Sequence, residues 1–287
     1  MCALLPQCGG LKQEDFEQVN VTGFDAKDNE SDHNDYAYAM EYFQADGADE
    51  GHIYVGTLNN MGNLMSFYIQ SLREGGDILD APMRPPEILR YRPDLGPTEW
   101  ETVFDYRDVE PESDFSTIGF RFMTVVELPD PEKQGGTSSY LYAATQGEDS
   151  VLWRTKTGNP GDWELAFTYE ALGGSIRWIE QLNGRMYLAV AYDSFGDVPP
   201  PGEIWVSDDG LTFRPIMQDG FGDPNNRGVQ ALIAWQGWIY AGTKNDIDGF
   251  DVWKLRPTEA NPEEYEYVRV VSGGGPSSHN ENAGMPI

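Results

Sequence analysis

The chain has 287 residues and a formal net charge of −29 at pH 7, from 48 acidic and 19 basic side chains. A field of that sign repels phosphate backbones and anionic lipid, which excludes nucleic acid and membrane surfaces as preferred partners. Hydrophobic residues make up 39% of the chain, and 32 Gly and 19 Pro are spread along it. This composition predicts a folded core with frequent turns rather than a disordered chain or a helical bundle.

The N-terminal segment carries little structural signal. Residues 1–14 lack the basic start and long apolar run of a signal peptide, so we expect them to be unstructured. Cys2 and Cys8 are the only cysteines and are expected to have no structural role, whether free or joined locally. No segment of the chain reaches the roughly 18 apolar residues of a membrane span. We favour an extracellular or cell-surface location, although this chain shows no signal peptide for it.

Four short β-prone runs then recur in the same order in four segments, and we name these strand positions a, b, c and d. Positions a and b are mostly apolar, b is centred on tyrosine, c pairs an aliphatic with an aromatic residue in most copies, and d alternates bulky and polar residues. The expected strands are 37–43, 52–57, 87–92 and 99–105; 119–125, 140–145, 151–156 and 162–168; 175–182, 185–190, 203–208 and 212–218; 229–235, 238–243, 251–256 and 265–271.

This repeat predicts an all-β fold, a β-propeller of four-stranded antiparallel blades, each packed between two neighbours. The spacing between the central tyrosines Tyr142, Tyr187 and Tyr240 is close to the ~40–50 residues of known blade repeats. The first interval is longer, because residues 61–86 are expected to insert between strands b and c of the first blade. Residues 126–138 are expected to lengthen the a-to-b turn of the second blade.

The two ends of the chain predict partial blades in addition to the four recognisable ones. Residues 16–22 match position d with no strands a to c before them, and 278–287 resemble 32–40, the entry to strand a. We interpret residues 15–287 as a single propeller domain that is either a fragment of a longer propeller or incompletely closed, since an open ring leaves unpaired strand edges.

One turn between strands c and d resembles a known motif. Ser207 to Phe213 (SDDGLTF) is similar to the Asp-box turn of sialidase-type propellers, one residue shorter than its pattern. The Asp carboxylate and the Ser hydroxyl of such a turn can satisfy backbone donors, while Gly210 accepts a positive φ and Phe213 packs underneath. We expect a structural turn rather than a site. Residues 153–163 look like a degenerate copy of it.

A wider combination of residues resembles bacterial Asp-box-like propeller repeat proteins of unassigned function. It comprises Gly220 to Asn226, Gly237 to Thr243, Asn245, Gly249 and Trp253, and is repeated in the first blade as Gly23-Phe24-Asp25, Asn34, Gly56-Thr57, Asn59 and Gly62. The resemblance covers roughly residues 15–287 and implies the propeller fold, but it implies no activity, because a fold is not a function.

Acidic and amide side chains gather in the loops that lead from strand d to strand a and from b to c. Strands alternate in direction, so these loops emerge on one face of a propeller, and their oxygens suit hydroxyl groups of a glycan or a cation. The candidate ligand-binding residues on this face are Asp25, Asp28, Asp32, His33, Asn34, Asn59, Asp223, Asn226 and Asn245. Capping of the turn into strand a is the competing interpretation for Asn34 and Asn226.

A metal site in the first of these loops is a further hypothesis. Asp28, Glu30 and Asp32 alternate along it and are hard oxygen ligands of the kind that Ca²⁺ prefers. The loop lacks the glycine and the distal glutamate of an EF-hand, so a solvated acidic loop remains the alternative. No other cofactor is expected.

Catalytic motifs are scarce. The chain has no H-E-x-x-H, G-x-S-x-G or Walker sequence. A sialidase would need three arginines around a carboxylate and a Tyr–Glu pair at the centre of the ring. Arg90, Arg154 and Arg177 fall on expected strands, but the sequence does not say which way they face. The tryptophans of strands c and d are expected to pack between blades; they are Trp100, Trp153, Trp163, Trp205 and Trp253.

The sequence therefore favours a non-catalytic ligand-binding or protein-interaction propeller that recognises a glycan, a cation or a protein through its acidic loop face. The alternative is a sialidase-like glycoside hydrolase with its site at the centre of the same face. A third hypothesis is a structural unit of a larger surface protein. Converging arginine and carboxylate side chains in a central pocket would distinguish the enzyme.

Overall fold

The computed structural model describes residue 19 and residues 36–58, 86–109, 117–147, 149–170, 174–192 and 200–273. These residues form an all-β fold of sixteen antiparallel strands and two short 3₁₀ turns, Tyr106–Asp108 and Gly220–Gly222. The strands are β1 (Tyr36–Phe43), β2 (His52–Leu58), β3 (Glu87–Tyr91), β4 (Trp100–Asp105), β5 (Thr117–Pro129), β6 (Thr137–Gly147), β7 (Ser150–Thr155), β8 (Glu164–Tyr169), β9 (Gly174–Leu182), β10 (Arg185–Tyr192), β11 (Glu203–Ser207), β12 (Arg214–Met217), β13 (Gly228–Trp235), β14 (Trp238–Lys244), β15 (Val252–Pro257) and β16 (Tyr265–Val271).

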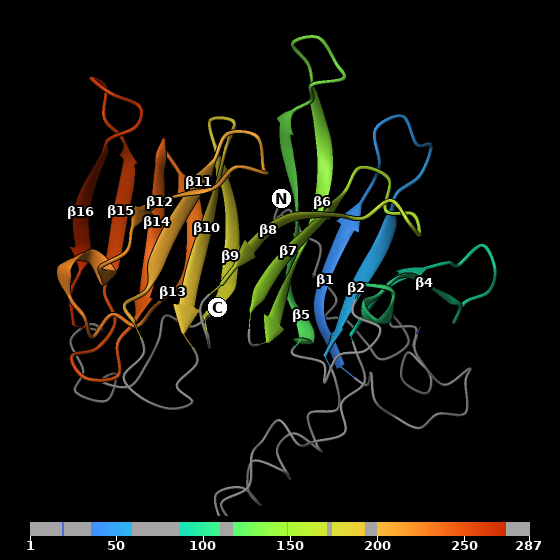
Figure 1. Cartoon of the computed structure of the whole chain (residues 1–287), viewed down its shortest axis with the longest axis horizontal. Coiled ribbons are helices and arrows are strands. Elements are labelled where there is room, and N and C mark those ends of the chain that lie inside the picture. The colour runs from blue at the N-terminus through green and yellow to red at the C-terminus, as the bar shows by residue number, and fades with distance from the viewer. Residues whose placement is uncertain are drawn as a thin grey trace, which may run out of the picture.

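The strands form four meanders, which we name sheet 1 (β1–β4), sheet 2 (β5–β8), sheet 3 (β9–β12) and sheet 4 (β13–β16). Within each sheet every strand pairs with the next along the chain. Single backbone bridges, Leu58 to Gly119 and Ala191 to Gly228, join sheet 1 to sheet 2 and sheet 3 to sheet 4. The four sheets follow one another in chain order from right to left in Figure 1.

The first strand of each sheet is its innermost strand, which makes the arrangement propeller-like. Strand β1 packs against β5, β5 against β9, and β9 against β13. The sixteen expected strands of the four full repeats all coincide with observed ones. The clearest difference is in sheet 2, where the segment 126–138, expected as a long turn, is largely strand: β5 and β6 extend into it and leave a turn only between Pro129 and Thr137.

Hydrophobic cores fill the junctions between consecutive described sheets, and both partners contribute to each junction. The core between sheets 1 and 2 combines Phe43 and Tyr54 with Phe120 and Leu141. Corresponding cores join sheet 2 to sheet 3 and sheet 3 to sheet 4. Because β-strand side chains alternate between the two faces, each middle sheet is apolar on both faces, which explains the nearly continuous hydrophobic runs at positions a and b.

Three of the five tryptophans expected to pack between blades do pack between consecutive sheets. Trp153 and Trp163 pack against the core between sheets 1 and 2, and Trp205 packs against the core between sheets 2 and 3. Trp253 instead stacks on Phe221 of the 3₁₀ turn, with ring centroids 4.9 Å apart and planes 5° from parallel. Trp100 donates its indole N–H to the carbonyl of Val19 at 2.9 Å.

Several expectations lie outside the described residues. These are the unstructured segment 1–14, the insertion 61–86 except for its last residue, the strand 16–22 except for Val19, and the strand entry 278–287. In the part of the chain that the structure describes, no helix is long and apolar enough to cross a membrane.

Candidate functional site

A β-bulge recurs at the same place in all four innermost strands. The pairing register shifts by one residue between Ala37 and Ala39 in β1, and the equivalent shifts occur in β5, β9 and β13. In each strand the extra residue is polar and is flanked by apolar ones; the four are Tyr38, Arg121, Arg177 and Gln230. A bulge redirects a side chain relative to the pleat and is common next to functional sites.

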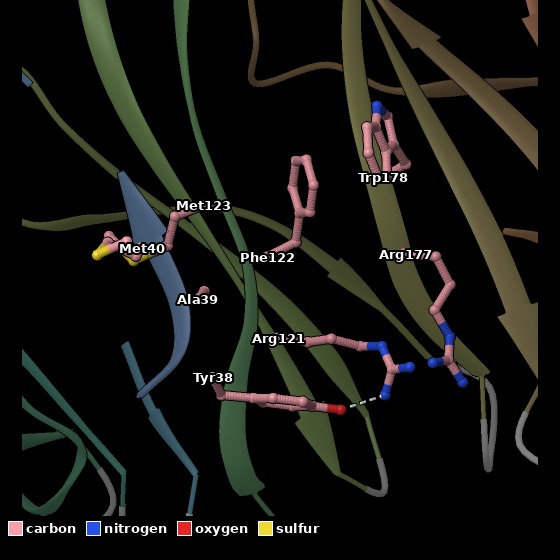
Figure 2. Close-up of a pocket in the computed structure, with 8 residues that line it drawn as sticks. All are labelled: Tyr38, Ala39, Met40, Arg121, Phe122, Met123, Arg177 and Trp178. Atoms are coloured by element: carbon pink, nitrogen blue, oxygen red, sulfur yellow. Dashed lines mark hydrogen bonds between the residues drawn. The ribbon is translucent and has the colours of Figure 1, made fainter. Parts of the chain in front are cut away.

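Three of the bulged residues line one cavity of about 370 Å³ along the inner strands. Tyr38, Arg121 and Arg177 provide its polar side chains, and Phe122 and Trp178 provide aromatic faces; Ala39, Met40 and Met123 complete the lining. Figure 2 shows the guanidinium groups of Arg121 and Arg177 turned toward each other from neighbouring strands. We name this cavity the axial pocket.

Hydrogen bonds hold the polar side of the axial pocket in place. Arg121 donates from Nη1 to the Tyr38 hydroxyl at 2.5 Å and to Gln146 Oε1 at 2.6 Å. Tyr38 in turn donates its hydroxyl proton to Gln146 Oε1 at 2.8 Å. These contacts link sheets 1 and 2 at their inner edge, so the Arg121 guanidinium has little freedom to turn away from the pocket.

Arg177 is more deeply buried, with only 5% of its surface exposed. It follows Ile176, which belongs to the core between sheets 2 and 3, and it precedes Trp178, whose ring lies 4.9 Å from that of Phe122. Packing on both sides therefore positions its side chain. Two guanidinium groups that face one cavity create a positive potential there, which favours an anion as ligand.

The other two arginines considered from sequence do not reach this pocket. Arg90 pairs with Glu101 at 2.7 Å and donates to Asn159 Oδ1 of the neighbouring sheet at 2.9 Å. Arg154 pairs with Glu164 at 2.7 Å and donates to the carbonyl of Asp209 at 3.2 Å. Both therefore join consecutive sheets, and only Arg177 of the three lines the axial pocket.

The candidate loop residues of sheet 4 are brought together by the structure. Asn226 and Asn245 are 0% and 1% exposed, and their side chains hydrogen-bond to each other at 3.1 Å. Asn226 also donates to the carbonyl of Gly220, and Asn245 Oδ1 accepts the backbone N–H groups of residues 247 and 248. Asp223 Oδ1 accepts the N–H of Asn225 at 2.9 Å. These hydrogen bonds stabilise the turn that leads into strand a. Contact of these side chains with a ligand stays a prediction.

The remaining candidates lie outside the described residues. They are the proposed ligand contacts Asp25, Asp28, Asp32, His33, Asn34 and Asn59, with Asp28, Glu30 and Asp32 as proposed metal ligands. Among the residues that the structure describes, no group of three or more His, Cys, Asp or Glu side chains is arranged to hold a metal ion.

The turn from Ser207 to Phe213 has the hydrogen bonds expected from its residues. Asp209 accepts from the N–H groups of Leu211 and Thr212 at 2.8 and 2.7 Å, and the Ser207 hydroxyl accepts from the N–H of Gly210 at 2.8 Å. Burial opposes ionisation of Asp209, but the donors around it hold its pKa below the ordinary value. Gly210 has φ 72°, the positive value expected at this place in the turn.

The axial pocket was missed from sequence, although a signal for it exists. When the four inner strands are aligned, a polar residue between two apolar ones recurs at one position in each, at Tyr38, Arg121, Arg177 and Gln230. A polar residue repeated at one position indicates a shared environment, and the centre of a propeller is the place where such strands meet.

Comparison with known proteins adds little beyond the fold. No protein-family model matches this chain, and no curated protein matches its sequence. Similar solved structures include an α-L-arabinofuranosidase from Fusarium graminearum, with 9% identity and a TM-score of 0.42 over 86% of this chain and 68% of that one. An exo-β-1,3-galactanase from Clostridium thermocellum has 12% identity and a TM-score of 0.41 over 90% of this chain and 53% of that one.

A family 117 glycoside hydrolase from the marine bacterium Zobellia galactanivorans is similar at 15% identity and a TM-score of 0.39, over 88% of this chain and 74% of that one. At these identities and TM-scores the likeness carries no information about a reaction or a ligand. The functional argument therefore rests on the axial pocket itself.

Proposed function

We propose that this chain is a propeller-like binding protein whose axial pocket holds a small ligand with a carboxylate, of the kind found in acidic sugars. The observation that carries the proposal is the convergence of Arg121 and Arg177 on one cavity in a chain of net charge −29. Guanidinium groups recognise carboxylates through paired hydrogen bonds, and two guanidinium groups that face one cavity can bind one carboxylate together.

The rest of the pocket suits a sugar-sized molecule. A cavity of about 370 Å³ falls at the lower end of the range for small-molecule sites. The rings of Phe122 and Trp178 offer apolar faces beside the two arginines, and the apolar side of a sugar ring can pack against such faces. The pocket lies near the start of the inner strands, which is the end of the sheets where the acidic d-to-a loops are expected.

Titration calorimetry tests this assignment. Glucuronate, galacturonate and N-acetylneuraminate are the anionic probes, and glucose and galactose are their neutral counterparts. We expect binding of at least one anionic sugar, weakened about 10-fold or more in the variants Arg121→Gln and Arg177→Gln, because a hydrogen bond to a charged group contributes about 1.5–3 kcal/mol.

A matched control is Arg269→Gln, since Arg269 lies on the outermost strand of sheet 4 with 52% of its side chain exposed. This variant should bind as the wild type does. Equal affinity for neutral and anionic sugars, or unchanged affinity in both pocket variants, would refute the carboxylate assignment.

Glycoside hydrolysis is the second candidate function, and the contact between Tyr38 and Arg121 favours it. A tyrosine hydroxyl can act as a nucleophile, and Arg121 Nη1 donates a hydrogen bond to the hydroxyl of Tyr38 at 2.5 Å. The described residues that line the pocket include no carboxylate to serve as its acid or base. Release of a fluorescent alcohol from aryl glycosides of the acidic sugars, lost in Tyr38→Phe, would support an enzyme. Binding without turnover would favour the binding protein.

Two features of the wider fold complete the proposal. Residues 15–287 form one propeller domain in which sheets 1 to 4 are blades, with partial blades contributed by the ends of the chain. The acidic segment 23–36 is proposed to contribute further polar contacts to the ligand, including a cation held by Asp28, Glu30 and Asp32. Support for this comes from the alternation of those residues and from the position of the loop ahead of β1.

A further inference from the structure

Two junctions between consecutive sheets contain the same aromatic arrangement. A tryptophan of strand c packs against an aromatic residue of strand d in the preceding sheet and against a tyrosine two residues later. Ring centroids in these contacts lie 5.0–6.3 Å apart, and both tyrosines are at most 5% exposed. The two sets are Phe104, Tyr106 and Trp153, between sheets 1 and 2, and Phe167, Tyr169 and Trp205, between sheets 2 and 3.

The junction between sheets 3 and 4 departs from this arrangement. Trp253 occupies the tryptophan position, because it pairs with β14 in the register in which Trp153 pairs with β6. Met217 pairs with β11 as Phe167 pairs with β7, so it takes the position of the aromatic residue of strand d. The residue two positions later is Asp219, which is exposed. A carboxylate therefore replaces the buried tyrosine of the other two junctions.

A cavity of about 570 Å³ lies at this place, within the size range of small-molecule sites. The Tyr267 hydroxyl donates to the carbonyl of Ile216 at 2.5 Å, and this hydrogen bond fixes the tyrosine ring between sheets 3 and 4. We name this space the aromatic cavity; its lining includes Ile216, Met217, Asp219, Phe221, Trp253 and Tyr267.

Phe221 contributes its ring to the cavity from a strained backbone. Its φ of 62° lies in the left-handed region, which is unfavourable for a residue with a side chain, and Gly220 and Gly222 beside it also have positive φ. The ring stacks on Trp253 and lies 6.0 Å from the ring of Tyr267. Strain of this kind is found where ligands bind. A cavity, a strained residue and a departure from the repeat therefore coincide at one place.

Asp219 is the charged group of the aromatic cavity. No other side chain among the described residues that line it carries a charge, and its carboxylate has no hydrogen bond or ion pair with the described part of the chain. Burial raises the pKa of Tyr267 to about 12, with further contributions from Tyr265 and from the charge of Asp219. The carboxylate therefore acts at short range on the rings around it.

The cationic side chains near the cavity have partners of their own. Arg214 pairs with Glu263 at 2.5 Å, and Arg269 lies over the ring of Trp253 and approaches Asp251 at 3.7 Å. Neither arginine lines the cavity. A carboxylate beside aromatic rings attracts a cation, and the net charge of −29 adds to this attraction.

We infer that the aromatic cavity binds a small organic cation with an apolar body, such as a quaternary ammonium ion. Asp219 is its counter-ion, and the rings of Phe221 and Tyr267 provide faces for its alkyl groups. The cation takes the space that a tyrosine ring fills at the other two junctions. This site is separate from the axial pocket, because neither Arg121 nor Arg177 lines the aromatic cavity.

Titration calorimetry with choline tests the inference, and 3,3-dimethyl-1-butanol is the neutral counterpart, in which carbon replaces the charged nitrogen. Choline should bind at least about 5-fold more tightly than the alcohol, because ring faces and a carboxylate attract the charge. The variants Asp219→Asn and Phe221→Leu should each weaken choline binding about 3-fold or more. Leucine keeps the backbone strain of position 221 and removes the ring.

Glu170→Gln is the matched control, since Glu170 is exposed and follows directly after Tyr169 in the equivalent loop of sheet 2. It removes one negative charge at another junction and should bind choline as the wild type does. Asp219→Tyr restores the tyrosine of the other junctions. It should abolish choline binding and leave the melting temperature equal to that of the wild type or above it, because the ring fills the cavity. Circular dichroism checks that every variant folds.

Three results would overturn the inference. Choline and the neutral alcohol could bind equally, which would exclude recognition of the charge. Choline affinity could be unchanged in both D219N and F221L, or no saturable binding could be found, which would exclude this cavity as a cation site. A melting temperature of D219Y several degrees below the wild type would mean that the junction has no space for a further group. These outcomes do not depend on the binding of anionic sugars in the axial pocket.

Discussion

The junction between sheets 1 and 2 can be tested with two glycines of one turn. Gly158 and Gly161 both lie between β7 and β8 and both have positive φ, 71° and 80°. A Cβ atom at Gly158 would collide with the ring and hydroxyl of Tyr54, whereas a Cβ atom at Gly161 would meet nothing within 4 Å. The variants Gly158→Ala and Gly161→Ala therefore share the backbone cost and differ only in packing between the sheets.

The expected difference follows from two contributions. A non-glycine residue in the left-handed region costs about 1–2 kcal/mol, and both variants lose this amount. Gly158→Ala also overpacks the contact with Tyr54, which costs about 1–3 kcal/mol more. We expect Gly158→Ala to lie about 2 kcal/mol below Gly161→Ala in free energy of unfolding, which corresponds to about 4–8 °C in Tm for a domain of this size.

Urea unfolding, monitored by tryptophan fluorescence, measures the free energy of unfolding of both variants. The same two substitutions are then made in a chain that also carries Tyr54→Phe. Removing the Tyr54 hydroxyl takes away the atom nearest to the new methyl group, so the difference between the two alanine variants should decrease there. If the two variants differed by less than about 0.5 kcal/mol in the wild-type background, packing of Tyr54 on the turn would not stabilise the junction, and the reasoning would fail.

Three further predictions concern other parts of the molecule. Asp209→Ala should destabilise the fold by about 2–3 kcal/mol, because it leaves the N–H groups of its turn without an acceptor, and Asp209→Asn should cost less; equal losses in chemical denaturation would contradict this. The hydrogen bond from Ser138 lowers the pKa of Asp130 to about 2, so its carboxylate stabilises the fold above about pH 4, and this contribution disappears as the pH falls through about 2. When the free energy of unfolding is measured as a function of pH, Asp130→Asn should approach the wild type at the lowest pH. A difference that stays constant with pH would refute this prediction. A cation held by residues 23–36 predicts a higher melting temperature in millimolar Ca²⁺ than in Mg²⁺ or EDTA, and the absence of a shift would exclude it.

Most of the strand pattern could be predicted from sequence because the same physical constraint acts four times. A strand covered on both faces must be apolar throughout, and a turn of fixed geometry needs glycine at a fixed place, so Tyr142 and Gly210 mark both elements clearly. The exception was the hairpin of β5 and β6. Its added length is a mixture of polar and apolar residues with no counterpart in the other three repeats. Nothing in the sequence therefore favours strand over turn there.

The axial pocket could not be located in the same way. In a regular strand, the alternation of side chains would predict which face of the sheet Arg121 and Arg177 lie on. Each of these residues lies at a β-bulge, where the alternation is interrupted. Arg177 was therefore considered without a direction, and Arg121 and Tyr38 were not singled out. The sequence pattern instead favours the polar loop residues, of which Asn226 and Asn245 hydrogen-bond to each other and Asn226 to the carbonyl of Gly220.

The recurring bulge separates the residues that determine sheet packing from the residues that line the axial pocket. Alternating positions of an inner strand specify which sheet packs on which, and a change there disturbs a hydrophobic core. The extra residue lies outside that alternation, so exchange of Tyr38, Arg121, Arg177 or Gln230 alters the charge and shape of the pocket while the pairing register is kept. A lineage of such proteins can therefore acquire a new ligand through a few point changes, with its architecture inherited intact.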